Sequence, residues 1–215
     1  MTGAREAVLA RVRAALDGRP EPPAVPRDHR AEGSLPRDAL LELLVERLEE
    51  TGAHVVRSSA PEAAIRAELE LRGAASVVVD PALPAALRPD GGEVREDDGL
   101  TPGDLDALDG AVTTCLAACA ETATLAFDGG PGQGRRAITL VPDLHVCVVA
   151  ADQVVETVPE LVARLEPSAR AGRALVLVSG PSATSDIEFQ RVEGVHGPRQ
   201  LVVVLVESDD VRLNA

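Results

Sequence analysis

The stretch that decides the fold reads ALVLVSGPSATSDIE from Ala174 to Glu188 and continues as GVHGPRQLVVVLV from Gly194 to Val206. Its two apolar runs, 174–178 and 201–206, predict buried strands. The residues between the runs are small, hydroxylated and acidic, and binding residues are often carried by loops that a rigid scaffold positions. We therefore expect the segment between the two strands to form the binding site.

Upstream of this stretch, helical and strand patterns alternate with short connections. An apolar stripe that includes Leu41, Leu44 and Leu48 predicts a helix, and residues 53–57 predict a strand. A second helix over 61–71 and a second strand over 75–79 follow. This order predicts an α/β fold with a mainly parallel sheet flanked by helices.

The first 33 residues are set apart from this pattern. Residues 3–16 predict an amphipathic helix with Val8, Val12 and Leu16 on its apolar stripe, and a proline-rich linker follows from residue 17. We divide the chain into a helical arm with its linker, 1–33, and an α/β domain, 34–215. We expect the arm to dock on its own domain, and a partner's surface is the alternative.

The middle of the chain gives weaker signals. The glycine-rich sequence DGGPGQG, 128–134, matches neither GxGxxG nor a P-loop, so we predict a wide β-hairpin turn that joins strands 122–127 and 136–141. Residues 116–121 suggest a short helical turn. Asp152 is expected to cap a helix that runs to residue 165.

Composition excludes several functional classes. The net charge is −14, and the chain has no Trp or Tyr, which argues against binding to nucleic acid. All 21 basic residues are Arg, so neither Schiff-base chemistry nor a P-loop lysine is available. No apolar stretch is long enough to insert into a membrane, and the start of the chain does not resemble a signal peptide, so we expect a cytoplasmic protein. Cys115, Cys119 and Cys147 match no cluster or disulfide pattern and are expected to be buried apolar residues.

The hydroxyl groups between the two strands could cap a helix start that binds an anion, and the carboxylates could bind a cation, a sugar hydroxyl or a proton. The structural alternative is that the hydroxyl groups cap a turn and the acids are solvated. The candidate binding residues in this segment are Gly180, Pro181, Ser182, Thr184, Asp186, Glu188, His196 and Gly197. The candidate catalytic residues are Glu121, Asp186 and His196, although Glu121 could simply end a helix. The histidine at 145 is interpreted as structural, and no spacing matches a metal site.

Four stretches together resemble the LUD-domain family, most closely its lactate utilization protein C (LutC) branch. They are AETAT at 120–124, PDLH at 142–145, GPSATSDIE at 180–188 and GVHGPRQL at 194–201. The resemblance adds Thr122 and Thr124 as candidate binding residues. The family pattern usually reads AETGT, whereas this chain has Ala123 in place of the glycine.

The resemblance implies a fold of the NagB/RpiA/CoA-transferase type, with a β-hairpin and the N-terminal helical arm. It also implies a non-redox subunit that supports oxidation of L-lactate to pyruvate together with iron–sulfur partner proteins, with no cofactor in this chain. In such a subunit we expect loops 180–198 to bind either a small anion or a partner's surface. The alternative is a free-standing transferase or ligase that acts on a nucleotide, a CoA or a phosphosugar substrate.

Overall fold

The computed structural model describes residues 2–18, 21, 23–26, 28–184, 192–193 and 196–207. Its main element is a six-stranded sheet of order β1-β12-β7-β4-β2-β3, in which every neighbouring pair is parallel. The strands are β1 (His54–Ser58), β2 (Ser76–Val79), β3 (Glu93–Glu96), β4 (Gly110–Thr114), β7 (Leu144–Ala150) and β12 (Gln200–Val206). The mainly parallel α/β fold predicted from the sequence is confirmed.

A second sheet of four strands has the order β8-β5-β6-β9. Its strands are β5 (Ala117–Cys119), β6 (Thr124–Phe127), β8 (Val154–Val155) and β9 (Val176–Val178). β6 pairs antiparallel with both β5 and β9. A two-stranded pair, β10 (Ala183–Thr184) and β11 (Val192–Glu193), completes the strands described. The two apolar runs that flank the predicted site therefore belong to different sheets, and the segment between them crosses from one to the other.

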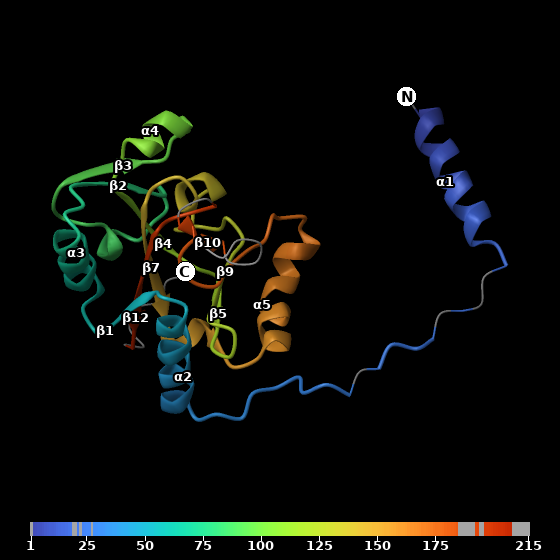
Figure 1. Cartoon of the computed structure of the whole chain (residues 1–215), viewed down its shortest axis with the longest axis horizontal. Coiled ribbons are helices and arrows are strands. Elements are labelled where there is room, and N and C mark those ends of the chain that lie inside the picture. Colours follow the sequence, from blue (N-terminus) through green and yellow to red (C-terminus); the bar gives the residue numbers. More distant parts are fainter. Residues whose placement is uncertain are drawn as a thin grey trace.

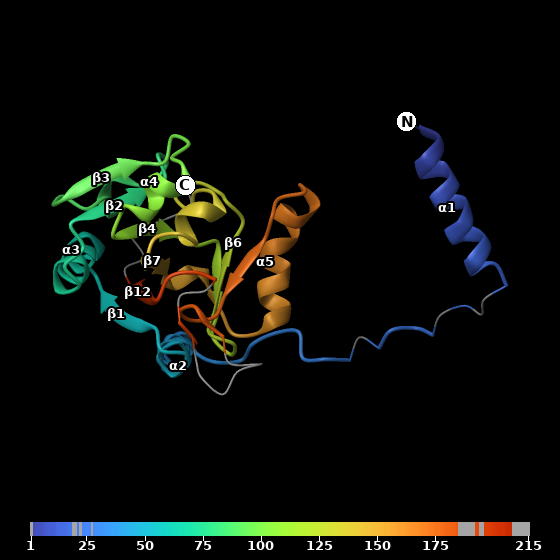
Figure 2. The same cartoon turned by 45° about the horizontal axis from the view of Figure 1, so that its top comes forward.

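Helices cover the sheets in layers, as Figures 1 and 2 show. The α-helices are α1 (Thr2–Leu16), α2 (Arg37–Glu50), α3 (Pro61–Leu71), α4 (Pro102–Asp106) and α5 (Val158–Arg170). Short 3-10 helices are η1 (Ala85–Leu87), η2 (Arg136–Thr139) and η3 (Ala151–Gln153). α3 packs on one face of the large sheet, while α2 and the second sheet cover the other face. α5 packs on the second sheet.

The central strand β12 shows how the sequence builds these layers. Val202, Val204 and Val206 face the cluster that contains α3, and the alternate residues 201, 203 and 205 face α2 and the second sheet. Successive side chains of a strand point to opposite faces, so a strand covered on both sides reads as a continuous apolar run. All six residues are buried.

Three local predictions are wrong. The hairpin joins β5 to β6 through residues 120–123, and residues 136–139 form η2 instead of a strand. Residues 116–121, expected as a helical turn, contain β5. The helix expected to begin at Asp152 begins at Val158, because Thr157 forms a capping box with Glu160 and supplies the cap.

The arm is separate from the body. In both views α1 stands clear of the two sheets, at the end of an extended segment (Figures 1 and 2). Within the described residues, no helix is long and apolar enough to cross a membrane.

Candidate functional site

A cavity of about 220 Å³ lies where the two sheets meet. It is lined by Arg136, Thr139, His145, Leu177, Val178, Ser179, Gly180, Pro181, Ser182, His196, Gly197, Pro198 and Leu201. β7 and β12 contribute residues at their amino ends, and β9 contributes residues at its carboxyl end. The cavity therefore lies at the amino edge of the parallel sheet, and the loop that crosses between the sheets forms much of its wall.

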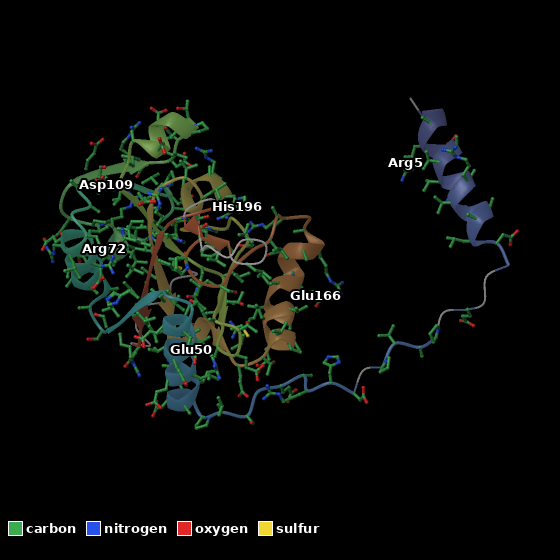
Figure 3. The ribbon with its side chains drawn as sticks, in the orientation of Figure 1. Arg5, Glu50, Arg72, Asp109, Glu166 and His196 are labelled. Atoms are coloured by element: carbon green, nitrogen blue, oxygen red, sulfur yellow. The ribbon has the colours of Figure 1, made fainter. Side chains whose placement is uncertain are left out.

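Five of the predicted binding residues line this cavity, namely Gly180, Pro181, Ser182, His196 and Gly197. The crossing loop is held by backbone contacts: Ser182 N–H donates to Pro198 O at 2.8 Å, and His196 N–H donates to Ser182 Oγ at 3.0 Å. Figure 3 shows His196 over the body near β10. The two halves of the predicted site thus do come together in space.

Gly180 has a packing role that the sequence did not predict. Its φ is +97°, and a Cβ there would lie 2.6 Å from Thr51 Oγ1 at the end of α2. Glycine is therefore required by the left-handed backbone and by the close approach of α2. These two constraints explain the glycine without a bound ligand.

The AETAT stretch lies beside the cavity without lining it. Thr122 Oγ1 and Thr124 Oγ1 are 2.8 Å apart, and Thr124 Oγ1 lies 2.8 Å from the hydroxyl of Ser179, which does line the cavity. Ala123 forms the turn between them with φ of +51°, a left-handed conformation that disfavours a side chain. The glycine of the family pattern therefore suits the backbone of this turn.

Glu121 is not among the residues that line the cavity. Its carboxylate pairs with Arg30 of the linker, and its backbone N–H donates to Glu156 O. This contact favours the structural interpretation of Glu121. Asp186 and Glu188 lie outside the described residues, as does the side chain of Thr184.

Two residues that the sequence analysis did not select give the cavity its chemistry. Arg136, on η2, donates from Nη1 to the carbonyl and the hydroxyl of Thr139, at 2.9 Å each, and forms no ion pair with any described carboxylate. Burial by its neighbours lowers the pKa of Arg136. The Arg135-Arg136 pair directly after the glycine-rich loop was the available signal, because no lysine could supply the charge.

The second residue, His145, is 1% exposed, and its Nε2 lies 2.8 Å from Thr113 Oγ1. Burial, with a smaller contribution from the charge of Arg136, lowers the pKa of His145 to about 4. The imidazole of His145 is therefore neutral at neutral pH, and Arg136 is the one Arg, Asp or Glu among the described residues that line the cavity. Such a wall favours a small anion.

A second cavity of about 380 Å³ adjoins the first and shares Arg136 and Thr139 with it. Its wall includes Gly129, Gly134 and Arg173. Burial raises the pKa of Asp128 in this wall, but hydrogen bonds from Ser168, Gly130, Arg173 and Gln133 outweigh it and keep the pKa below its usual value. Arg173 is thus already paired with a carboxylate, at 2.9 Å.

The three cysteines are buried and free, as predicted. A contact with Cys147, together with burial, raises the pKa of the Cys115 thiol well above its usual value. A thiol must lose its proton to bind a metal, so Cys115 is a poor ligand. No group of three His, Cys, Asp or Glu residues in the described part of the chain could hold a metal ion.

Comparison with known proteins assigns the family. The LUD domain model matches residues 94–206, just over half of the chain. The chain belongs to the LUD-domain family. This LUD-domain protein is 43% identical over 173 residues to a protein from Deinococcus radiodurans named Lactate utilization protein C, a match that covers 80% of this chain and 82% of the relative.

Two further comparisons agree with this assignment. A Lactate utilization protein C from Halalkalibacterium halodurans is 32% identical over 92 residues, which cover 41% of this chain and 40% of the relative. The crystal structure of a DUF162 family protein from Deinococcus radiodurans superposes with a TM-score of 0.70 at 34% identity, over 80% of this chain and 99% of the other. The LUD-domain protein thus shares sequence with the proteins named Lactate utilization protein C, and both sequence and fold with the DUF162 family protein.

Proposed function

We propose that this LUD-domain protein acts in lactate utilization and binds a small carboxylate anion in the cavity between its two sheets. Its similarity to proteins named Lactate utilization protein C supports the process. The observation that supports an anionic ligand is the charge of Arg136. This side chain lines the cavity and pairs with no carboxylate among the described residues.

The other lining groups suit the same ligand. A guanidinium binds a carboxylate through two parallel N–H donors, and Arg136 Nη2 makes no hydrogen bond within the described residues. The hydroxyls of Ser179 and Ser182 add polar contacts. The volume of about 220 Å³ is below the roughly 300 Å³ at which drug-sized pockets begin, so a short acid such as lactate or pyruvate suits the cavity.

Binding measurements test this ligand directly. L-lactate and pyruvate would be titrated into the wild type, Arg136→Gln and Arg66→Gln by calorimetry. Arg66 is a matched control, because it lies on α3, pairs with Asp90 and does not line the cavity. We expect Arg136→Gln to weaken binding about tenfold or more, as loss of a charged hydrogen bond worth roughly 1.5–3 kcal/mol predicts. Equal affinity in Arg136→Gln and wild type would refute the assignment.

We further propose that the chain is a non-redox subunit, and that iron–sulfur partner proteins carry the electrons when L-lactate is oxidised to pyruvate. The cysteine content supports the assignment of electron transfer to the partners, because the chain has only three cysteines, all buried and free. Fe–S clusters are usually held by four thiolates. The chain's own contribution is then to bind the anion and to contact the partners.

Cells grown on lactate provide the test of this role. Affinity purification of the tagged chain should recover proteins with iron–sulfur absorbance, and deletion of the gene should abolish lactate-dependent electron transfer. Normal growth on lactate after deletion, with no iron–sulfur protein recovered, would contradict the proposal.

A second candidate function rests on the adjoining cavity. Its glycine-rich wall and the shared Arg136 would suit a longer phosphorylated ligand, which favours a transferase or ligase acting on a nucleotide, a CoA or a phosphosugar. Thermal shift measurements with ATP, acyl-CoA, sugar phosphates and lactate separate the two functions. A large shift with one phosphorylated ligand and none with lactate would favour the enzyme.

A further inference from the structure

The arm helix α1 has an apolar stripe that no described residue covers. Val8, Val12 and Leu16 recur every four residues, which places them on one side of the helix. They are 50%, 48% and 51% exposed. A 15-residue helix with such a stripe is marginal in water by itself and is usually stabilised by packing.

The body has an apolar groove of matching size. It has a volume of about 770 Å³ and runs between α5 and the strand segment around β9. Val158, Val162, Leu175 and Leu177 line it and are 43%, 57%, 38% and 58% exposed. At about 1.5 Å per residue, the 13 residues of α5 and the 15 of α1 give helices of similar length, roughly 20 Å.

The linker brings the arm to this groove. Glu156, just before α5, accepts hydrogen bonds from Ser34 N–H at 2.6 Å and Leu35 N–H at 2.7 Å, and it pairs with Arg30 at 2.7 Å. His29 already lines the groove. Twelve residues lie between Leu16 and His29, and an extended chain of this length reaches about 40 Å. The tether is therefore anchored at one end of the groove and is long enough for the arm to fold back.

Charge favours the same contact. α1 carries Arg5, Arg11 and Arg13 against Glu6, whereas the whole chain has a net charge of −14. Glu166 lines the groove. Figure 3 places Arg5 on α1 and Glu166 on α5, the helix of the body nearest to α1 in the views.

We propose that α1 docks lengthwise in the groove between α5 and β9 of its own chain, with Val8, Val12 and Leu16 packed on Val162, Leu175 and Leu177. The short anchored tether makes the chain's own groove the nearest apolar surface, which favours it over the groove of a second copy. Leu177 also lines the candidate anion cavity. The docked arm would therefore form a neighbouring wall of that cavity.

Engineered cysteines test the docked position. Val12→Cys with Val162→Cys should form a disulfide within one chain at low protein concentration, seen as a faster-migrating monomer on a non-reducing gel. The matched control pairs Val12→Cys with Leu71→Cys, because Leu71 is 75% exposed on α3 and outside the groove. Equal cross-linking in both pairs, or disulfide-linked dimers alone, would overturn docking within the chain.

A mutant cycle tests the contact without a covalent bond. The full-length triple variant Val8→Ser, Val12→Ser and Leu16→Ser and the single variant Val162→Asp each remove one side of the contact. All four positions are exposed in the undocked structure, so the fold of the body remains. Each variant should lower the Tm by about 3 °C, and their combination should lower it no further. Additive losses, or an unchanged Tm in the triple variant, would overturn the proposal.

Discussion

One strand of each sheet, β12 and β9, is built from similar residues but buries them very differently. β12 and β9 are both runs of Val and Leu, yet the last six residues of β12 are fully buried, whereas Leu177 in the middle of β9 is 58% exposed. β12 lies between two neighbours inside a covered sheet, and β9 pairs with β6 at the edge of the smaller one. An apolar run therefore predicts a strand, and its place in the sheet decides what the run contributes to stability.

The largest expected effect comes from one substitution made in both sheets. Leu205→Ala removes a fully buried side chain from β12, and Leu→Ala changes of this kind destabilise proteins by about 4 kcal/mol. Leu177→Ala should cost clearly less, because the body leaves most of that side chain exposed and the docked arm would be its main additional contact. Urea denaturation of both variants measures the difference. Equal losses would show that β9 is as well covered as β12.

The pH dependence of stability tests the effect of burying the imidazole of His145 in the large sheet. Its pKa is about 4 in the folded protein, against an ordinary value of 6.5. Since the unfolded chain takes up the proton first, stability is complete above pH 6.5 and falls as the pH drops towards 4. A difference of this size corresponds to about 3 kcal/mol.

His145→Gln should remove this part of the pH profile, whatever its effect on stability at neutral pH. His54→Gln is the control, because the His54 side chain is 52% exposed. Denaturation at pH 7, 5.5 and 4 compares the three proteins. A profile that is the same for His145→Gln and wild type would mean that the buried imidazole does not control acid sensitivity.

The smallest expected effect concerns strain in the second sheet. Ala123 has φ of +51°, a conformation that costs a non-glycine residue about 1 kcal/mol or more. Ala123→Gly should therefore stabilise the protein by about 1 kcal/mol at most, since added freedom in the unfolded chain offsets part of the gain. Ala118→Gly, in regular strand β5, should destabilise it. Loss of stability in Ala123→Gly would show that the turn is not strained.

The same contrast explains what the sequence could predict. Strands β1, β2 and β12 and helix α3 lie within one or two residues of their predicted ranges, and the stripe of Leu41, Leu44 and Leu48 lies on α2 as predicted. The crossing loop, which the sequence predicts as the site, contributes Gly180, Ser182 and His196 to the wall of the cavity. Turn residues between two buried strands leave few other places for a polar site.

The second sheet escaped prediction for physical reasons. β5 has three residues and β8 has two, too few for any periodicity to appear. Residues 136–139 were assigned to a hairpin strand because a glycine-rich turn precedes them, but they form η2 and place Arg136 at the cavity. Neither residue spacing nor composition predicts that Arg136 pairs with no carboxylate in the described part of the chain, since pairing depends on tertiary contacts.

The position of the cavity between the sheets also affects how long the protein survives. Leu177 and Val178 belong to β9, while His145 and Leu201 belong to the large sheet, so an occupant of the cavity contacts both. A ligand that binds only the assembled form lowers the population of open forms in proportion to its occupancy. Proteases cleave such open forms. Turnover of the protein would then slow when its ligand is abundant, so the amount of the protein would follow the supply of the small molecule that it binds.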